Sequence, residues 1–454
     1  MLEERTYEPS TAYDWRPPPA AMNERGTRFY LHEFDNACGD SSKTRHAFRK
    51  LLGGRPMQEV LPIAMSQYVP DTHLMDAFEQ HPCRTHNPAH ADWHVISAVP
   101  ATSDALGGLG LLGGPAGHQQ RMQDLGKCLL ANRHWAQRGV RFLLHVPSLD
   151  LEMTVGRDVM QAVMRRDLRV GPVVLGVFDR SSVASGNNNK RYHRLFNHSL
   201  VLPHVASPSI AQSKLPSAQP RRGYMFHGDM GRFDGGARSA MQEVASFLRQ
   251  PYASRSRSDL NRGVGRAKLP SFDADGLAVP SAGHAMEMAA AENTSRVMMS
   301  SSICFAPQGD IMTSRRLFDA LASGCVPAVV KSIGNSPKEV LLGNLPFWHS
   351  VDWREIALFV APRIVGRGAF LKSPTVVGCR TEEAGWLDAL HDSGEHLERA
   401  RRNARAAFEA AMDVEFNPSG VVTAILDELP HILSESGIMM PATYAHLPRT
   451  HAAS

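Results

Sequence analysis

The chain lacks several features that would assign a function class directly. Its 454 residues contain no apolar run of about 18 residues, so no transmembrane helix is predicted. The formal net charge is only +4 and the basic residues are spread along the chain, so no nucleic-acid partner is predicted. The charged, proline-rich N-terminus has no apolar core of a secretory signal, so we expect residues 1–26 to be a disordered lead-in.

Motifs for metal binding and for covalent catalysis are scarce too. None of the six cysteines form a C-x-x-C pair, so no zinc site is expected. Cys304 and Cys325 lie inside apolar runs, which predicts buried core thiols, while cysteine spacing alone leaves disulfides undecided. Neither a Walker sequence nor Gly-x-Ser-x-Gly occurs. Residues 273–275 read Asp-Ala-Asp, and there we predict a loop and not a metal site.

One glycine motif suggests a different class of enzyme. Residues 108–113, GLGLLG, match G-x-G-x-x-G, and a reading as an NAD enzyme or a phosphosugar isomerase rests on this match alone. The nearest predicted strand ends near residue 100, too early for the tight strand–turn–helix of a dinucleotide site. We therefore predict a glycine loop.

Short apolar runs alternate with helical spacing in both halves of the chain, which is typical of parallel sheets covered by helices. A segment rich in Ser, Pro, Ala and Gln, residues 206–222, is the predicted linker. We predict two α/β domains, 27–205 and 223–436, with a ligand cleft between them and a tail at 437–454. The predicted strands are 93–100, 141–149, 172–179, 224–228, 303–307 and 326–330. The predicted helices are 118–138, 156–168, 235–249, 314–323, 384–412 and 419–436.

The most informative stretch is ICFAPQGDIMTSRRLFDALASGCVPAVV, at residues 303–330. Two buried strands enclose a loop and one helix, with Thr313 or Ser314 as N-cap and Gly324 just past the helix end. The loop is therefore expected at the carboxyl end of a parallel strand, where open α/β sheets bind ligands. The helix would point its free backbone N–H groups at the same place, which favours an anion.

Two adjacent arginines, Arg315 and Arg316, stand in the first turn of this helix. Cations at that end oppose the helix dipole by about 0.3–1 kcal/mol each. A phosphate-bearing ligand would offset this cost, because a guanidinium binds phosphate through two hydrogen bonds. Neighbouring residues lie about 100° apart around a helix, so we expect at most one arginine to meet the ligand. The alternative is that the arginines are solvated or pair with Asp310 or Asp319.

Sequence motifs in and around this stretch follow one another in a recognisable order. S-x-I-C-F-x-P-x-G-D at 301–310 is followed by S-x-R-x-F-D-A at 314–320 and G-C-V-P at 324–327. Together they resemble the signature of the exostosin family, the family 47 glycosyltransferases. Further segments that resemble the family are RTHNPAHADWHVISAVP (84–100), HWAQRG (134–139), Arg222 with Phe226-His227-Gly228, Arg238, and LPFW…VDW (345–353).

This resemblance implies a GT-B-like α/β fold, in which two Rossmann-like domains face each other across a cleft. It implies an inverting hexosyltransferase that transfers a sugar from a nucleotide-sugar donor to a glycan or polysaccharide acceptor. A UDP-sugar is the favoured donor. The resemblance does not fix a required cofactor and leaves a divalent metal open. Relatives work in the Golgi lumen behind an N-terminal anchor. Asp319 would contact the ribose or sugar, or only hold an arginine. The implied donor-binding residues are Arg222, Gly228, Arg238, Gly309, Asp310, Ser314, Arg316 and Asp319.

An inverting transfer also needs a base for the acceptor hydroxyl, usually a carboxylate or a histidine. Where relatives show Asp-His, this chain has Val140-Arg141, and where they show His-Asp it has Leu149-Asp150. Asp150, at the end of a predicted strand, and Asp71, which aligns with a family glutamate, are the two candidates for the catalytic base. Either carboxyl is alternatively a helix cap or a surface acid. The departure from the family pattern leaves open a catalytically inactive exostosin-like protein that binds glycan or nucleotide.

Overall fold

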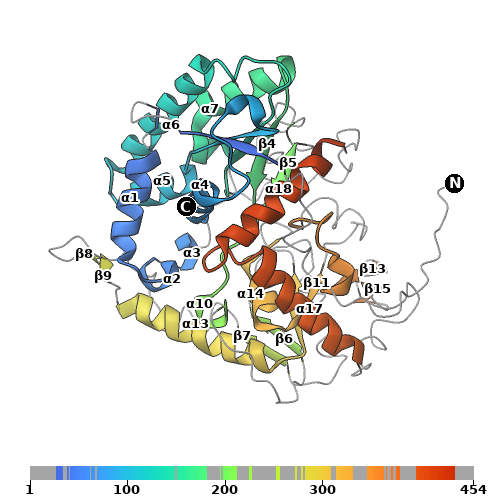
Figure 1. Ribbon diagram of the computed structural model, residues 1–454. Helices are drawn as coiled ribbons and strands as arrows, with labels where there is room; N and C mark the ends of the chain where they lie inside the picture. The colour runs from blue at the N-terminus through green and yellow to red at the C-terminus, as the bar shows by residue number, and fades with distance from the viewer. Residues whose placement is uncertain are drawn as a thin grey trace.

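Two sheets, one from each half of the chain, organise the computed structural model (Figure 1). The residues that it describes are 27–33, 38–39, 41–61, 63–66, 69–148, 151–180, 195, 198–211, 224–227, 252–255, 271–272, 278–279, 282–307, 313–330, 345–361, 364–365, 370–371, 375–378 and 395–434.

The first sheet is parallel throughout, in the order β1-β2-β3-β4-β5. Its middle strands read WHVI, FLLH and VVLGV, apolar runs without polar alternation, because both faces are covered. Val95 and Leu143 pack into one buried cluster, while Ile96 and Leu144 pack into another on the opposite face. The strands are β1 Phe29–His32, β2 Trp93–Ile96, β3 Phe142–His145, β4 Val173–Val177 and β5 Ser199–Val201. The helices of this half are α1 Ser41–Leu52, α2 Met57–Val60, α3 Ile63–Ser66, α4 Asp71–Gln80, α5 Pro100–Gly108, α6 Gly114–Ala131 and α7 Leu151–Arg169, with a 3-10 turn at Pro88–His90.

The second sheet has the order β15-β12-β11-β10-β6-β7, and only β15 runs antiparallel to its neighbour. Its strands are β6 Tyr224–His227, β7 Tyr252–Arg255, β10 Ile303–Pro307, β11 Val326–Val330, β12 Leu358–Ala361 and β15 Thr375–Gly378. The helices of this half are α10 Pro208–Ala211, α13 Ala282–Ser300, α14 Arg315–Ser323, α17 Glu395–Ala411 and α18 Pro418–Ser434, with a 3-10 turn at Trp353–Glu355. Two small hairpins pair β8 Ser271–Phe272 with β9 Ala278–Val279, and β13 Ile364–Val365 with β14 Phe370–Leu371.

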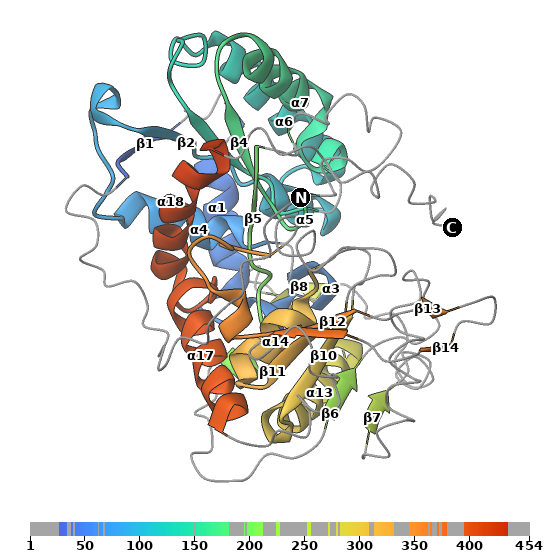
Figure 2. The ribbon, with the colours of Figure 1, turned by 90° about the vertical axis from the view of Figure 1, so that its right-hand side faces the viewer.

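Helix α18, the last that the structure describes, connects the two sheet units. Figure 2 shows α17 beside the second unit and α18 beside the first. On one side of α18 the hydroxyl of Thr423 lies 3.1 Å from His81 Nε2, just after α4. On the other side Glu428 accepts a hydrogen bond from Ser350, at 3.1 Å, and contacts His349 Nδ1 at 2.6 Å. The helix therefore bonds residues of both halves.

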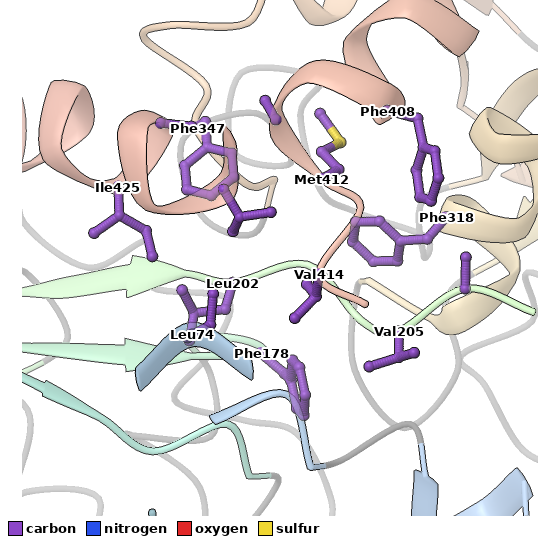
Figure 3. Packing of buried hydrophobic residues seen from close by; sticks show 14 of the residues in the cluster. Leu74, Phe178, Leu202, Val205, Phe318, Phe347, Phe408, Met412, Val414 and Ile425 are labelled. Carbon is purple, nitrogen blue, oxygen red and sulfur yellow. The ribbon is translucent and has the colours of Figure 1, made fainter. Parts of the chain in front are cut away.

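One buried apolar cluster continues from the first unit into the second. Figure 3 shows Leu74, Phe178 and Val205 of the first half close to Phe318 and Val414 of the second. Burying each such side chain is worth about 1.5–3 kcal/mol relative to leaving it exposed. This shared core, rather than a linker alone, holds the two units in their relative position.

The structure confirms the predicted α/β class and shows a GT-B-like pair of Rossmann-like units. The predicted strands all form, though several are shorter by a few residues, and the 303–330 unit is β10, α14 and β11, with the two strands adjacent and parallel. The helix predicted at 118–138 ends early, at Ala131. The one predicted at 156–168 is preceded by a further helical stretch from Leu151, and the two are separated by a kink at Gly156, whose φ is 74°. The predicted helix 235–249 lies outside the described residues. The predicted linker opens with the short helix α10, and its remainder, 212–223, lies outside them as well.

The prediction for two cysteines is corrected. Cys304 and Cys325 are buried as expected, but they form a disulfide and are not thiols, and a second disulfide joins Cys38 to Cys128. Cys304 lies in β10 and Cys325 directly precedes the adjacent strand β11, so their Cα atoms are 5.8 Å apart, within bonding range. The two cysteines are 21 positions apart in sequence, and the parallel pairing of the two strands brings them together.

Removing the Cys304–Cys325 disulfide should destabilise the protein. The loop that it closes predicts a loss of about 3 kcal/mol in unfolding free energy for Cys304→Ala with Cys325→Ala, because the unfolded chain regains freedom. The measurement is the midpoint of thermal unfolding, with Cys83→Ala, at a free and half-buried cysteine, as the matched control. A double variant that melts with the wild type would contradict this expectation.

Candidate active site

Helix α14 points its first turn toward the carboxyl end of the second sheet. It starts directly after Ser314, whose φ of −135° and ψ of 157° are those of a residue entering a helix, and it ends at Gly324 in the left-handed region, with φ 64°. Leu317, Phe318 and Leu321 are buried, which seats the helix on the sheet. The free N–H groups of its first turn therefore lie beyond the end of β10, as predicted for an anion site.

Ser314 occupies the N-cap position without acting as a cap. Its side chain makes no cap hydrogen bond, and its Oγ is buried without a partner among the residues that the structure describes. Buried hydroxyls almost always find a hydrogen-bond partner in the native protein. An oxygen in this state, at the positive end of a helix, is well placed to bind a ligand.

The two arginines have different surroundings. Arg315 pairs with Asp319 one turn later, at 3.3 Å from Nε to Oδ2, and both side chains are largely buried. Pairing with Asp319 is one of the alternatives that the sequence left open for the arginines. Arg316 is half-buried in the same first turn and does not share that ion pair.

Both oxygens of Asp319 are bonded within the protein. Oδ2 faces Arg315, and Oδ1 accepts a hydrogen bond of 2.7 Å from the backbone N–H of Ser207, at the start of α10. Of the two roles considered for Asp319, holding an arginine is thus an observed contact.

The loops after β4 and before α14 also touch. The Thr313 hydroxyl donates to the backbone carbonyl of Phe178 at 2.7 Å, and both residues are buried. Phe178 directly follows β4 of the first sheet. The carboxyl ends of the two sheets therefore face each other at this point.

Asp71 is a fully buried helix cap. Its Oδ2 accepts from the backbone N–H groups of Ala101, at 2.8 Å, and Thr102, at 3.2 Å, which open α5. Its Oδ1 accepts from the N–H of Thr72 at 3.1 Å and from the Thr102 hydroxyl. Burial raises the pKa of Asp71 to about 6, against the effect of these donors. The cap is one of the two alternatives that the sequence left open for this carboxyl.

The structure brings together only part of the predicted site. Ser314, Arg316 and Asp319 share α14 and its cap, whereas Asp71 lies in the first unit under α5. The other predicted site residues lie outside the described residues: Asp150, Arg222, Gly228, Arg238, Gly309 and Asp310.

The family follows from a comparison with known domains. The exostosin GT47 domain matches residues 23–372, well over half of the chain. The chain belongs to the exostosin GT47 family. This membership agrees with the signature around α14 and places the chain in a family of glycosyltransferases.

Among the solved structures that weakly resemble the exostosin chain are two that cover most of it, while no curated protein matches it. One is a protein of Listeria monocytogenes assigned as a UDP-N-acetylglucosamine 2-epimerase, 10% identical, with a TM-score of 0.30, covering 90% of this chain and 96% of its own. The other is the glycosyltransferase SnogD from Streptomyces nogalater, 13% identical, with a TM-score of 0.28, covering 91% of this chain and 100% of its own.

Other sequence motifs of the exostosin chain take on a structural meaning. GLGLLG joins α5 to α6, so it is a helix–loop–helix connection and cannot be the strand–turn–helix of a dinucleotide site. Asp273 to Asp275 lie outside the described residues. Among those described, no group of three His, Cys, Asp or Glu side chains is placed to hold a metal ion, and no helix has the length and apolar character needed to cross a membrane.

Two residues of this region, Phe178 and Ser207, were missed from the sequence, as were their bonds to Thr313 and Asp319. Thr313 and Phe178 are 135 positions apart, and Ser207 and Asp319 are 112 apart. No local pattern signals a contact over such distances, because each residue alone looks like an ordinary loop or helix position.

Replacing Asp71 distinguishes a cap from a catalytic base. Asp71→Ala leaves the N–H groups of α5 without an acceptor and should lower the unfolding free energy by about 1–2 kcal/mol, whereas Asp71→Asn keeps an acceptor oxygen. Chemical denaturation measures both variants. An Asp71→Asn protein that is stable but cannot transfer sugar would instead assign the base to Asp71.

The wild type and Asp71→Asn should also differ in how their stability depends on pH. The folded pKa of Asp71, about 6, lies above its ordinary value of 3.8, so protonation favours the folded state. The stability that this protonation contributes is complete below pH 3.8 and disappears as the pH rises through about 6. The wild type should therefore lose stability relative to Asp71→Asn between about pH 4 and pH 6, in thermal unfolding at a series of pH values. If the difference in stability between the wild type and Asp71→Asn stays the same across that range, the raised pKa of Asp71 is contradicted.

Proposed function

We propose that this protein is an inverting glycosyltransferase that moves a sugar from a nucleotide-sugar donor, a UDP-sugar first among them, to a glycan or polysaccharide acceptor. The observation that carries the proposal is the buried hydroxyl of Ser314, which has no hydrogen-bond partner among the described residues and lies beside Arg316 at the positive end of α14. Membership of a glycosyltransferase family supports it. The chemistry that such a position suits is recognition of a diphosphate.

The proposed reaction is one displacement at the anomeric carbon. The acceptor hydroxyl oxygen bonds to that carbon while the carbon–oxygen bond to the diphosphate breaks, and a base takes the hydroxyl proton. Negative charge grows on the departing oxygen, where the N–H groups of α14, Ser314 and Arg316 stabilise it without reorganising. Gly309 and Asp310 would complete the loop at the diphosphate, and Arg222, Gly228 and Arg238 would form the other wall of the donor pocket.

The base is proposed to come from the first unit. Asp150 is the stronger candidate, because the oxygens of Asp71 are already bonded to helix N–H groups and the residue is fully buried. Asp319, whose oxygens face Ser207 and Arg315, is proposed to shape the donor site mainly by holding these groups in place.

The proposed location is the lumen of the Golgi. Two disulfides, Cys38–Cys128 and Cys304–Cys325, support an oxidising compartment, because such bonds are rare in proteins of the cytosol. No metal or other cofactor is needed for the charge stabilisation described, and dependence on a divalent ion is a matter for assay with a chelator.

Substitutions at the cap should separate ligand binding from folding. Ser314→Ala should weaken nucleoside diphosphate binding about tenfold, because a hydrogen bond to a charged group is lost. Its melting temperature should not change, since the hydroxyl caps nothing. Arg316→Ala should reduce turnover about 10²–10³-fold, with exposed Arg402→Ala as the control. Titration calorimetry and a transfer assay measure these effects, and undiminished activity of Arg316→Ala would refute the donor-site assignment.

A binding protein without activity is the competing function. The missing Asp-His, replaced by Val140-Arg141, favours it, while the intact Ser314 and Arg316 favour an enzyme. We expect hydrolysis or transfer with at least one member of a panel of nucleotide sugars. Nucleotide binding in calorimetry without any turnover across that panel would instead support the inactive protein.

A further inference from the structure

Residues on both sides of the proposed donor site bond to other parts of the chain, one to the first sheet unit and the other to the connector that opens with α10. Before the site, the Thr313 hydroxyl donates to Phe178 at 2.7 Å. After it, Asp319 accepts from the N–H of Ser207 at 2.7 Å. Ser314 and Arg316 lie between these two bonds. We call the pair of bonds, Thr313–Phe178 and Asp319–Ser207, the latch.

An aromatic contact also links the two units close to the Thr313–Phe178 bond. The ring of His204 stacks on Phe178, with centroids 4.0 Å apart and an interplanar angle of 9°, and lies 5.6 Å from the ring of Phe318 in α14. Burial, and then the charge of Arg315, lower the pKa of His204 to about 3, so the ring is neutral. A neutral ring packs between the two units without the cost of burying a charge.

The segment that connects the two units is fastened to the second one. Asp319 receives the N–H that opens α10, and Arg405 of α17 donates to the carbonyls of Ile210, at 3.3 Å, and Ala211, at 2.9 Å, at its other end. Arg405 also donates to the carbonyl of Ala322 in α14. The connector, α14 and α17 are therefore joined, and the Thr313–Phe178 bond links the entry to the donor helix with the loop after β4 of the first sheet.

We propose that Thr313 is a positioning residue, whose bond to Phe178 sets the distance between the donor site and the acceptor side of the protein. This inference rests on the proposed function. The loop after β4 stands at the carboxyl end of the first sheet, the side from which an acceptor would approach a donor on α14. Transfer to a glycan depends steeply on that distance, since a displacement of about 1 Å can reduce the rate about 10²-fold. Water, which needs no acceptor site, can attack the donor regardless.

The test is Thr313→Val, which keeps the shape of the side chain and removes its O–H. We expect transfer to the glycan to fall about tenfold or more, while donor hydrolysis and nucleotide affinity stay unchanged. Thr313→Ser, which restores the hydroxyl, should recover transfer. An equal loss of transfer and hydrolysis, or no loss in Thr313→Val, would overturn the proposal.

A second measurement does not depend on activity. Hydrogen exchange of the backbone N–H groups around Thr313 and at the start of α14 should be faster in Thr313→Val than in the wild type and Thr313→Ser, because a local tie is lost. Unchanged exchange there contradicts the latch even if the protein transfers no sugar. Absence of transfer, hydrolysis and nucleotide binding in the wild type, by contrast, contradicts the proposed function and not the latch.

Discussion

The hydrogen bond from Thr313 to Phe178 joins a residue that directly precedes the cap of α14 to the residue that directly follows β4, in the other sheet unit. Parallel strands place their carboxyl ends at one edge of a sheet, and here two such edges meet. Everything proposed for the chemistry depends on this meeting, since a donor held on α14 is useful only where an acceptor can reach it. The ring stack of His204 on Phe178 and the connector clamp formed by Arg405 support the same arrangement.

The βαβ unit at 303–330 could be predicted because its signals are local. Apolar runs of strand length, a cap residue before the helix and Gly324 after it all lie within a few positions of the elements that they define. The pairing of Arg315 with Asp319 was among the predicted alternatives because its signal is local too. Residues four apart share a helix face. The family signature lies in the same stretch, and the remaining site residues were predicted from the resemblance to that family.

What could not be predicted depends on residues far apart in sequence. The oxygens of Asp71 meet N–H groups about thirty positions away, and only the packing of α4 against the start of α5 reveals a cap. Cys304 and Cys325 looked like core thiols because burial is visible in composition, while strand pairing is not. Helices α1 and α13 were missed too, as neither carries motifs of the kind that made α14 recognisable.

Helix α18 has a consequence for how the protein is made. It buries Ile425 and Leu429 in the shared core and bonds to His81 beside α4, yet it is built from residues 418–434. While the chain emerges from the ribosome, the first sheet unit is complete in sequence long before this helix exists. The surface of α4 that α18 covers therefore stays uncovered until residues 418–434 have been synthesised. The joining of the two sheet units thus depends on a helix that lies far from α4 in sequence.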